Sequence, residues 1–390
     1  MRDELISKTK KIFQSKFQIT PKKMILSPGR INIIGEHIDY NDGFVLPGAI
    51  DKYICFGFNK NNSNTSQIYA LDFNSFFEFD IVTKIEKSDL QWTNYLLGVC
   101  NQLKINNFEI KGFDCVFCSD IPIGAGLSSS AALVCGFLYG LNELFELRLS
   151  PIQIALMGQK AEQWVGINCG IMDQFASVMG LENKLLKIDC RTLDFEYFDA
   201  DFREYSIVLF DSKITHALAN SAYNLRRKQC EEGLKIIQNY FPEVHSFRDF
   251  SLLKLDTLAS KMNKIVFKRC QYVIKEIGRV EAACIAIQAK NITDLGTLMY
   301  KTHQGLADEY EVSCPELDFL VRTVQSKNWS IGSRVMGGGF GGCTINLIEK
   351  NIENQVVKDM KELYFEKFGL ELINYTVNLS NGTCLIDAAL

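Results

Sequence analysis

Long apolar runs are missing from this sequence. No stretch of about 18 or more apolar residues occurs among its 390 residues, whereas a helix that crosses a bilayer needs about 20. The first residues, Met1-Arg2-Asp3-Glu4-Leu5, also lack the apolar core of a signal peptide. We therefore expect no contact with a membrane and no secretion, and we place the chain in the cytoplasm.

Proline and basic clusters are scarce as well. Only 7 prolines and 23% charged residues occur, which excludes a disordered chain. The formal net charge is -4 and no long basic run is present, so no nucleic-acid surface is expected. Hydrophobic residues make up 47% of the chain, enough for substantial cores, and the length favours two domains.

Cysteine, by contrast, is frequent, and its pattern favours free thiols. The 13 cysteines are odd in number and lie scattered through apolar stretches. Cys115 and Cys118 form a C-x-x-C pair with no second pair and no histidine cluster nearby, so we expect neither a zinc site nor a redox site. A reduced protein is the simpler interpretation.

The hydrophobic pattern predicts an α+β chain, because strands and helices do not alternate strictly. Helices are predicted at 3–17, 92–103, 129–146, 150–164 and 351–368, with a long helical region at 218–290. Strands are predicted at 23–35, 44–59, 68–82, 113–119 and 343–348, and again within 184–210. A domain boundary near residue 200 divides the chain into residues 1–200 and 201–390.

A loop of small residues lies between a predicted strand and an apolar helix. Residues 122–132 read PIGAGLSSSAA. Glycines let the backbone approach a ligand closely, and the unpaired amides of a helix N-terminus attract phosphate. The alternative is a plain strand-to-helix turn capped by Ser128. The chain contains no Walker loop.

A second polar segment joins two predicted strands. Arg30, Glu36, His37 and Asp39 lie together in residues 27–41, SPGRINIIGEHIDYN. Carboxylates and a histidine suit sugar hydroxyls, each of which donates and accepts hydrogen bonds. The alternative is a charged surface turn in which Arg30 forms a salt bridge.

A third segment places one acidic residue among glycines and apolar residues. Residues 166–175 read GINCGIMDQF, and Asp173 is the acidic residue. A desolvated carboxylate is suited to act as a base. The alternative is a helix-capping aspartate.

A fourth segment is rich in glycine. Residues 336–343 read MGGGFGGC, which indicates a backbone that passes close to another group. The alternative is a flexible hairpin loop.

These four segments, in this order, resemble the galactokinases of the GHMP kinase superfamily. The resemblance extends from Pro28 to Cys343. It implies an N-terminal domain like ribosomal protein S5 domain 2 and a ferredoxin-like C-terminal domain, with ATP between them. It also implies transfer of the γ-phosphoryl group of ATP to the anomeric hydroxyl of α-D-galactose, the first committed step of galactose catabolism by the Leloir pathway. We expect a monomer that binds galactose, ATP and Mg²⁺.

The resemblance also implies a role for individual residues. Asp173 matches the catalytic base, and Arg30 matches its partner. The sugar contacts implied are Glu36, His37, Asp39, Gly170, Asp173 and Tyr223. The ATP contacts implied are Trp92, near the adenine, and Gly124, Ala125, Gly126, Leu127, Ser128, Ser129 and Ser130, around the phosphates. Ser130 and Glu162 match the magnesium ligands.

Two positions depart from the family pattern. Ile38 stands where many galactokinases have threonine, and isoleucine is also found there in N-acetylgalactosamine kinases. One residue, Gln163, separates Glu162 from Trp164, where the family usually has two. Two alternatives therefore stay open: an N-acetylgalactosamine kinase, and a non-catalytic sensor of sugar and ATP. The loop of residues 122–132, called the serine-rich loop below, is present, as are Arg30 and Asp173, and this argues against the sensor.

Overall fold

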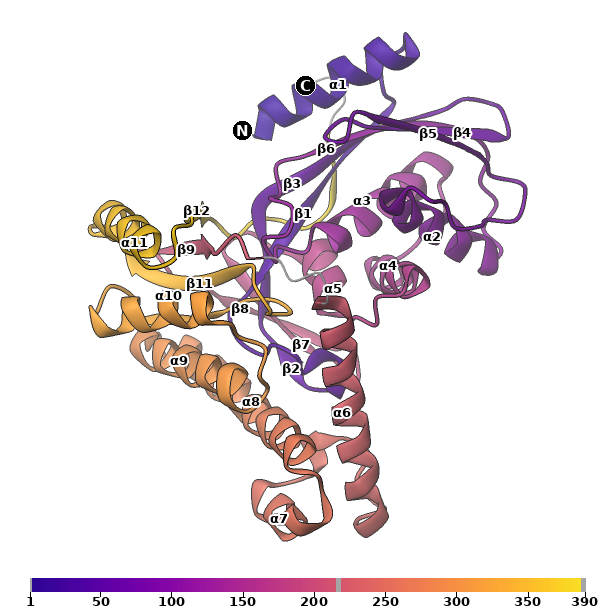
Figure 1. Ribbon diagram of the computed structural model, residues 1–390. Coiled ribbons are helices and arrows are strands. Elements are labelled where there is room, and N and C mark those ends of the chain that lie inside the picture. Colours follow the sequence, from indigo (N-terminus) through magenta and orange to yellow (C-terminus); the bar gives the residue numbers. More distant parts are fainter. Residues whose placement is uncertain (1, 215–218, 387–390) are drawn as a thin grey trace.

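The computed structural model describes residues 2–214 and 219–386. Helices and strands are mixed without strict alternation, as predicted for an α+β chain, and they build three sheets (Figure 1). The predicted helix start at residue 218 lies outside the described residues.

The largest sheet belongs mainly to the N-terminal half of the chain. Its strand order is β13-β1-β3-β6-β4-β5, and among its described strands only the β4–β6 pair is parallel. The strands are β1 (Lys23–Asn32), β3 (Pro47–Lys60), β4 (Thr65–Ala70), β5 (Ser75–Asp80), β6 (Phe113–Ser119) and β13 (Cys384–Ile386). The last described strand, β13, therefore returns to pair with the first one.

Helices cover both faces of this sheet (Figure 1). On one face lies α1 (Arg2–Phe17), whose Leu5 and Ile6 pack on Met24 and Leu26. The other face carries α2 (Gln91–Ile105), α3 (Ser129–Phe145), α4 (Pro151–Val165) and α5 (Met172–Met179). Ser150 caps α4 through a reciprocal pair with Gln153.

The C-terminal half builds a second sheet with the order β10-β11-β9-β12. Its strands are β9 (Tyr205–Asp211), β10 (Gly332–Val335), β11 (Cys343–Glu349) and β12 (Ile373–Val377). One face packs on α10 (Pro315–Ser326) and α11 (Glu353–Phe368). Residues of the other face, such as Leu209 and Ile345, belong to the large core shared with the N-terminal half.

The remaining elements connect these layers. A small sheet of β2 (Phe44–Val45), β7 (Lys184–Asp189) and β8 (Phe195–Asp199) lies beside the main sheet. The predicted helical region at 218–290 is not one helix. It consists of α6 (Ala219–Tyr240), α7 (Leu252–Thr257) and α8 (Lys264–Gln288), with 3-10 turns between α6 and α8. Helix α9 (Ile292–Asp308) follows and packs beside α8 and β10.

Two sequence predictions need correction. Residues 68–82, predicted as one strand, form the hairpin of β4 and β5, because residues 71–74 make a turn with Asn74 at a φ of 45°. The strand predicted at 23–35 ends at Asn32, and residues 33–38 form a buried turn.

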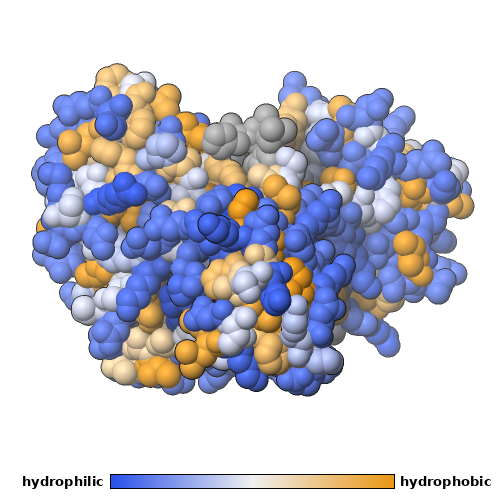
Figure 2. All heavy atoms as spheres, turned by 60° about the horizontal axis from the view of Figure 1, so that its bottom comes forward, coloured by the Kyte–Doolittle hydropathy of each residue, from blue (hydrophilic) through white to orange (hydrophobic). Residues whose placement is uncertain are grey.

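The face of the molecule drawn in Figure 2 is mainly polar. In the face drawn in Figure 2, apolar residues are scattered in small groups among hydrophilic ones. Within residues 2–214 and 219–386, no helix is both long and apolar enough to cross a bilayer.

The C-x-x-C pair lies on β6 with its thiols on opposite faces: Cys115 lies in the main core and Cys118 packs under α1.

Close packing of α3 on the main sheet generates the first prediction. A methyl group on the buried Gly140 would overlap the ring of Phe58 in β3. We expect Gly140→Ala to lower the free energy of unfolding by about 1–3 kcal/mol through overpacking. The control is Gly278→Ala on α8, where the added methyl meets nothing within 4 Å. That change should raise stability by about 0.5–1 kcal/mol. Urea unfolding followed by circular dichroism measures both, and an unaltered midpoint for Gly140→Ala would contradict the packing argument.

Candidate active site

One small cavity, of about 50 Å³, gathers residues from distant parts of the chain. Its walls come from β1 and the turn after it, the start of α5, the helix α6 and the loop between β10 and β11. The residues that line it are Arg30, Glu36, His37, Asp39, Cys169, Gly170, Met172, Asp173, Tyr223, Gly337 and Gly338. All the residues predicted to be catalytic or to bind sugar are in this set.

Arg30 and Asp173 form an ion pair at the wall of the cavity. Nε of Arg30 donates to Oδ1 of Asp173 at 2.7 Å, and Nη2 donates to Oδ2 at 3.1 Å. The Arg30 side chain is 4% exposed and that of Asp173 is 27% exposed. The third nitrogen, Nη1, donates to the carbonyl of Gly126 at 2.6 Å. The guanidinium therefore connects the Asp173 carboxylate with the serine-rich loop.

The charge of Arg30 is secured by its neighbours. Burial by itself lowers the pKa of Arg30, but the carboxylates of Asp173, Glu36 and Asp39 outweigh burial, so the pKa is raised above its ordinary value.

Asp173 does not cap α5, whose N-cap residue is Ile171. The alternative of a helix-capping aspartate is therefore wrong.

The serine-rich loop runs from β6 into the N-terminus of α3. Gly124 and Gly126 have φ angles of 78° and 74°, in the left-handed region that favours glycine. Ala125 and Leu127, on either side of Gly126, are buried and anchor the loop. The loop thus presents backbone to the solvent side just before the free amides of α3.

Ser128 occupies the N-cap position of α3 without capping it. Its φ is 57°, and its hydroxyl makes no hydrogen bond to the helix backbone. It donates instead to Oδ2 of Asp173. The alternative of a plain turn capped by Ser128 is therefore wrong, and the Asp173 carboxylate accepts three hydrogen bonds.

The glycine-rich loop between β10 and β11 lies against the serine-rich loop. A Cβ on Gly337 would come within 3.3 Å of the carbonyl of Gly126, and one on Gly342 within 3.6 Å of the carbonyl of Gly124. A side chain on Gly341 would overlap the carbonyl of Ile214. Close backbone contact, rather than flexibility, explains these glycines.

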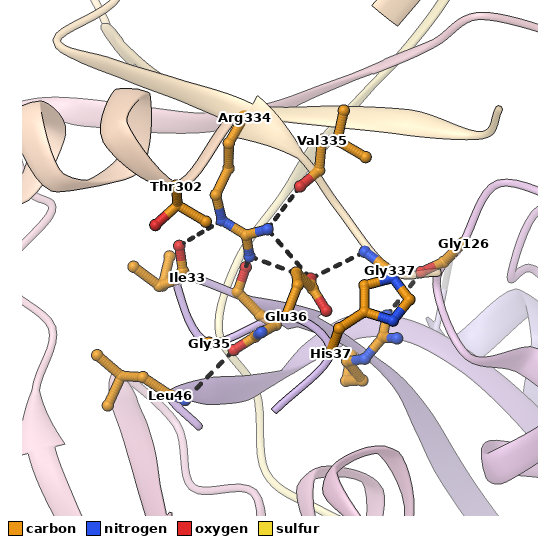
Figure 3. A network of polar contacts seen from close by, with 12 residues as sticks. Ile33, Gly35, Glu36, His37, Leu46, Gly126, Thr302, Arg334, Val335 and Gly337 are labelled. Atoms are coloured by element: carbon orange, nitrogen blue, oxygen red, sulfur yellow. Dashed lines mark hydrogen bonds and ion pairs between the residues drawn. The ribbon is translucent and has the colours of Figure 1, made fainter. Parts of the chain in front are cut away.

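The turn after β1 holds Glu36 beside this glycine-rich loop (Figure 3). Glu36 is 2% exposed, and its Oε1 accepts from the backbone N–H of Gly337 at 2.8 Å. The same oxygen accepts from Nη1 and Nη2 of Arg334, at 3.2 and 3.1 Å. Arg334, on β10, is fully buried.

His37 is held as a neutral imidazole. Its Nε2 lies 3.1 Å from the carbonyl of Gly338, which only accepts, so Nε2 carries the proton. Nδ1 then accepts from the hydroxyl of Tyr40 at 2.7 Å, and Tyr40 accepts from Tyr310 at 2.9 Å. Burial, with a smaller contribution from the nearby charge of Arg226, lowers the pKa of His37 to about 3.

Asp39 faces the cavity beside Gly170. A methyl group on Gly170 would overlap the Asp39 carboxylate, so only glycine fits at this position. Burial, followed by the nearby charges of Asp173 and Glu36, raises the pKa of Asp39 to about 7. Tyr223, from α6, lies over the opposite side with its ring centre 5.3 Å from that of His37.

Ser130 and Glu162 lie side by side behind the loop and offer oxygen ligands. Burial raises the pKa of Glu162 to about 7, and hydrogen bonds from Ser130 and Gln174 oppose that rise. Gln174 donates to Glu162, while its own buried Oε1 has no hydrogen-bond partner. The Glu162 carboxylate and the Ser130 hydroxyl are hard oxygen donors of the kind that fits Mg²⁺.

Trp92 and Ile38 lie outside the wall of the cavity. Trp92 begins α2 and packs on Phe117 of β6, with ring centres 5.7 Å apart, and on Phe73 and Phe77. Ile38 is fully buried in the main core, so its side chain contributes packing rather than a cavity surface.

Comparison with known proteins agrees with this arrangement. The galactokinase galactose-binding signature matches residues 11–60, and the N-terminal and C-terminal GHMP kinase domains match residues 94–181 and 283–365. Galactokinases of Roseiflexus sp. and Thermosipho africanus are 37% and 38% identical to the chain. They align with 95% and 93% of it and with 94% and 99% of their own lengths. The chain belongs to the galactokinase family.

Solved structures show the same relationship. A galactokinase of Lactococcus lactis, crystallised with galactose, superposes with a TM-score of 0.94 at 33% identity and covers 97% of this chain and 99% of its own. A mevalonate kinase superposes with a TM-score of 0.63 at 20% identity and shares the fold. The GHMP kinase fold predicted from the four segments is therefore confirmed for this galactokinase-family chain.

Several residues around the cavity were not predicted. Cys169 and Met172 flank predicted residues in the third segment, and Gly337 and Gly338 lie in the glycine-rich segment, so their segments were recognised but not their roles. No sequence motif indicates a role for Arg334 or Tyr310, because an isolated arginine or tyrosine does not reveal which distant residue it contacts in the fold.

The raised pKa of Asp39 predicts a pH-dependent cost in stability. The unfolded carboxyl ionises near pH 4 and the folded one near pH 7, so the folded state binds the proton more tightly and loses stability as pH rises between these values. Asp39→Asn removes this loss. We expect the stability gained by Asp39→Asn to grow by on the order of 2 kcal/mol from pH 5 to pH 8.

Urea unfolding of wild type and variant at both pH values measures this difference. Asp256→Asn, at an exposed position on α7, reports the effect of removing one surface charge. A stability gain from Asp39→Asn that was the same at pH 5 and pH 8 would show that Asp39 is not desolvated.

Proposed function

We propose that the protein transfers the γ-phosphoryl group of ATP to the anomeric hydroxyl of α-D-galactose, giving galactose 1-phosphate and ADP. The observation that carries this proposal is the Arg30–Asp173 pair. It lies in the wall of the cavity with the sugar-type residues and is hydrogen-bonded to the loop suited to phosphate. Phosphoryl transfer needs the sugar hydroxyl and the γ-phosphate of ATP aligned with each other, and the Arg30–Asp173 pair lies where the two regions meet.

In this proposal Asp173 receives the proton of the anomeric hydroxyl. Three donors, two from Arg30 and one from Ser128, hold its carboxylate in one orientation. The proton is transferred as the sugar oxygen bonds to phosphorus and becomes more acidic. Arg30 offsets the negative charge around the transferred group.

The sugar is held by the other residues of the cavity. Asp39 and Glu36 supply carboxylate oxygens, and Tyr223 supplies an aromatic face and a hydroxyl. Both ring nitrogens of His37 already have hydrogen-bond partners. His37 therefore contacts the sugar with its ring face as long as its hydrogen bond to the carbonyl of Gly338 is kept. Because His37 is neutral, no cation competes with Arg30 at the sugar.

The ATP side of the site is supplied by the N-terminal half. The backbone and hydroxyls of residues 124–130 receive the phosphates, and Trp92 lies near the adenine. Ser130 and Glu162 would hold Mg²⁺, which neutralises phosphate charge when bound. The protein is proposed to act as a monomer. The 13 free cysteines support a reducing compartment such as the cytoplasm.

A substrate panel tests the reaction. ATP consumption is measured with galactose, N-acetylgalactosamine, glucose and mevalonate, and galactose is expected to give the highest kcat/KM. A higher kcat/KM for N-acetylgalactosamine would instead support the N-acetylgalactosamine kinase alternative. If no sugar supported turnover while galactose and ATP both bound by calorimetry, the sensor alternative would stand and the proposed reaction would be wrong.

Substitution of Asp173 tests the proton acceptor. Asp173→Asn keeps the shape of the side chain but removes its ability to take a proton. We expect kcat to fall by roughly 10²- to 10⁴-fold, while the Kd for galactose changes far less. Asp256→Asn is the control for an unrelated loss of charge. Near-normal turnover of Asp173→Asn would rule out the base and leave alignment by Arg30 as the main contribution.

A further inference from the structure

Arg334 is a buried cation that the phosphoryl transfer itself does not use. It lies on β10, in the C-terminal half, and points at the turn after β1 (Figure 3). Its relative exposure is 0%. Burying a guanidinium is costly unless every donor is paired, so the partners of Arg334 indicate what the charge is for.

All five N–H groups of Arg334 have an acceptor. Nε donates to the carbonyl of Ile33 at 2.7 Å, and Nη1 donates to the carbonyl of Val335 at 2.5 Å. Nη2 donates to the carbonyl of Asn32. The remaining N–H of each terminal nitrogen points to Oε1 of Glu36. Arg334 therefore binds both the backbone of the turn and the carboxylate that the turn carries.

The two oxygens of Glu36 are treated differently. Oε1 accepts from both terminal nitrogens of Arg334 and from the N–H of Gly337, which exhausts its capacity. Among the described residues, no hydrogen bond ends on Oε2. Because Glu36 lines the cavity, Oε2 is the oxygen left to accept a hydroxyl from a ligand.

We propose that Arg334 is a positioning residue for sugar specificity: by binding Oε1 of Glu36 it fixes Oε2 so that this oxygen accepts one particular galactose hydroxyl. This inference rests on the proposed function. Lysine does not replace arginine in this role, because one ammonium group lacks the planar set of donors that holds two carbonyls and a carboxylate at once.

Monodeoxygalactoses provide the test, since each lacks one hydroxyl. For each enzyme, kcat/KM is measured with galactose and with its 2-, 3-, 4- and 6-deoxy forms. The hydroxyl bound by Glu36 is the one whose removal no longer matters in Glu36→Gln. In wild type that removal should lower kcat/KM by roughly 10- to 100-fold, as expected for a hydrogen bond to a charged group.

Arg334→Lys should lose this discrimination selectively. Its kcat/KM should fall by roughly 10- to 100-fold with galactose, by less than about threefold with the deoxy sugar identified by Glu36→Gln, and its KM for ATP should stay within about threefold. The control is Arg269→Lys on α8, another buried arginine paired with a carboxylate, which lies outside the cavity wall. It should keep the wild-type discrimination even if its stability falls.

A double variant keeps the inference testable if Arg334→Lys does not fold. Arg334→Met/Glu36→Gln removes both charges together and leaves no unpaired ion in the core. If Arg334 acts through Glu36, the double variant discriminates among the sugars as Glu36→Gln alone does. A further change in discrimination in the double variant, or an equal loss with all five sugars in Arg334→Lys, would overturn the inference. If wild type did not phosphorylate galactose, the proposed function would fall first and this inference with it.

Discussion

The buried turn of residues 33–38 needs a partner for each of its backbone polar groups, and much of the structure is arranged to supply them. The N–H of Gly35 donates to Glu276 of α8, and the carbonyl of Glu36 accepts from Tyr272 of the same helix. The carbonyls of Asn32 and Ile33 accept from Arg334. An unpaired backbone group in the interior costs about as much as a lost hydrogen bond. The turn therefore keeps its shape only when the C-terminal half is in place.

The same constraint brings the two ligand regions together. The glycine-rich loop that follows β10 donates the N–H of Gly337 to Glu36 and lies against the serine-rich loop at Gly126. A single backbone segment thus contacts the sugar side and the phosphate side. A Cβ on Gly337 would crowd the carbonyl of Gly126, and one on Gly341 would overlap the carbonyl of Ile214, so glycine at these positions lets the loop lie close to its neighbours.

The four acidic residues around the site have been given different environments. Asp173 is paired with Arg30, and Glu36 is paired with Arg334. Asp39 and Glu162 have no ion-pair partner within 4.0 Å among the described residues, and burial raises the pKa of each to about 7. Two carboxylates are thereby paired with arginine, while the other two gain from a ligand that brings donors or a cation. That difference fits the proposed binding of both a sugar and magnesium-bound phosphates.

The sequence by itself determined the chemistry-bearing segments and the family, because the loop with Gly124–Ser130, the turn with Glu36–Asp39 and the segment with Asp173 are each contiguous. It also predicted most helices and strands, since their apolar periodicity is local. Elements whose partners are distant, such as β13 beside β1 and the buried turn at 33–38, were missed or placed wrongly. Only the tertiary structure decided that Ser128 binds Asp173, that His37 is neutral with its proton on Nε2, and that Arg334 fixes Glu36. Each of these depends on a hydrogen-bond partner at least 45 residues away in the sequence. Only folding of the chain brings such partners within hydrogen-bonding distance.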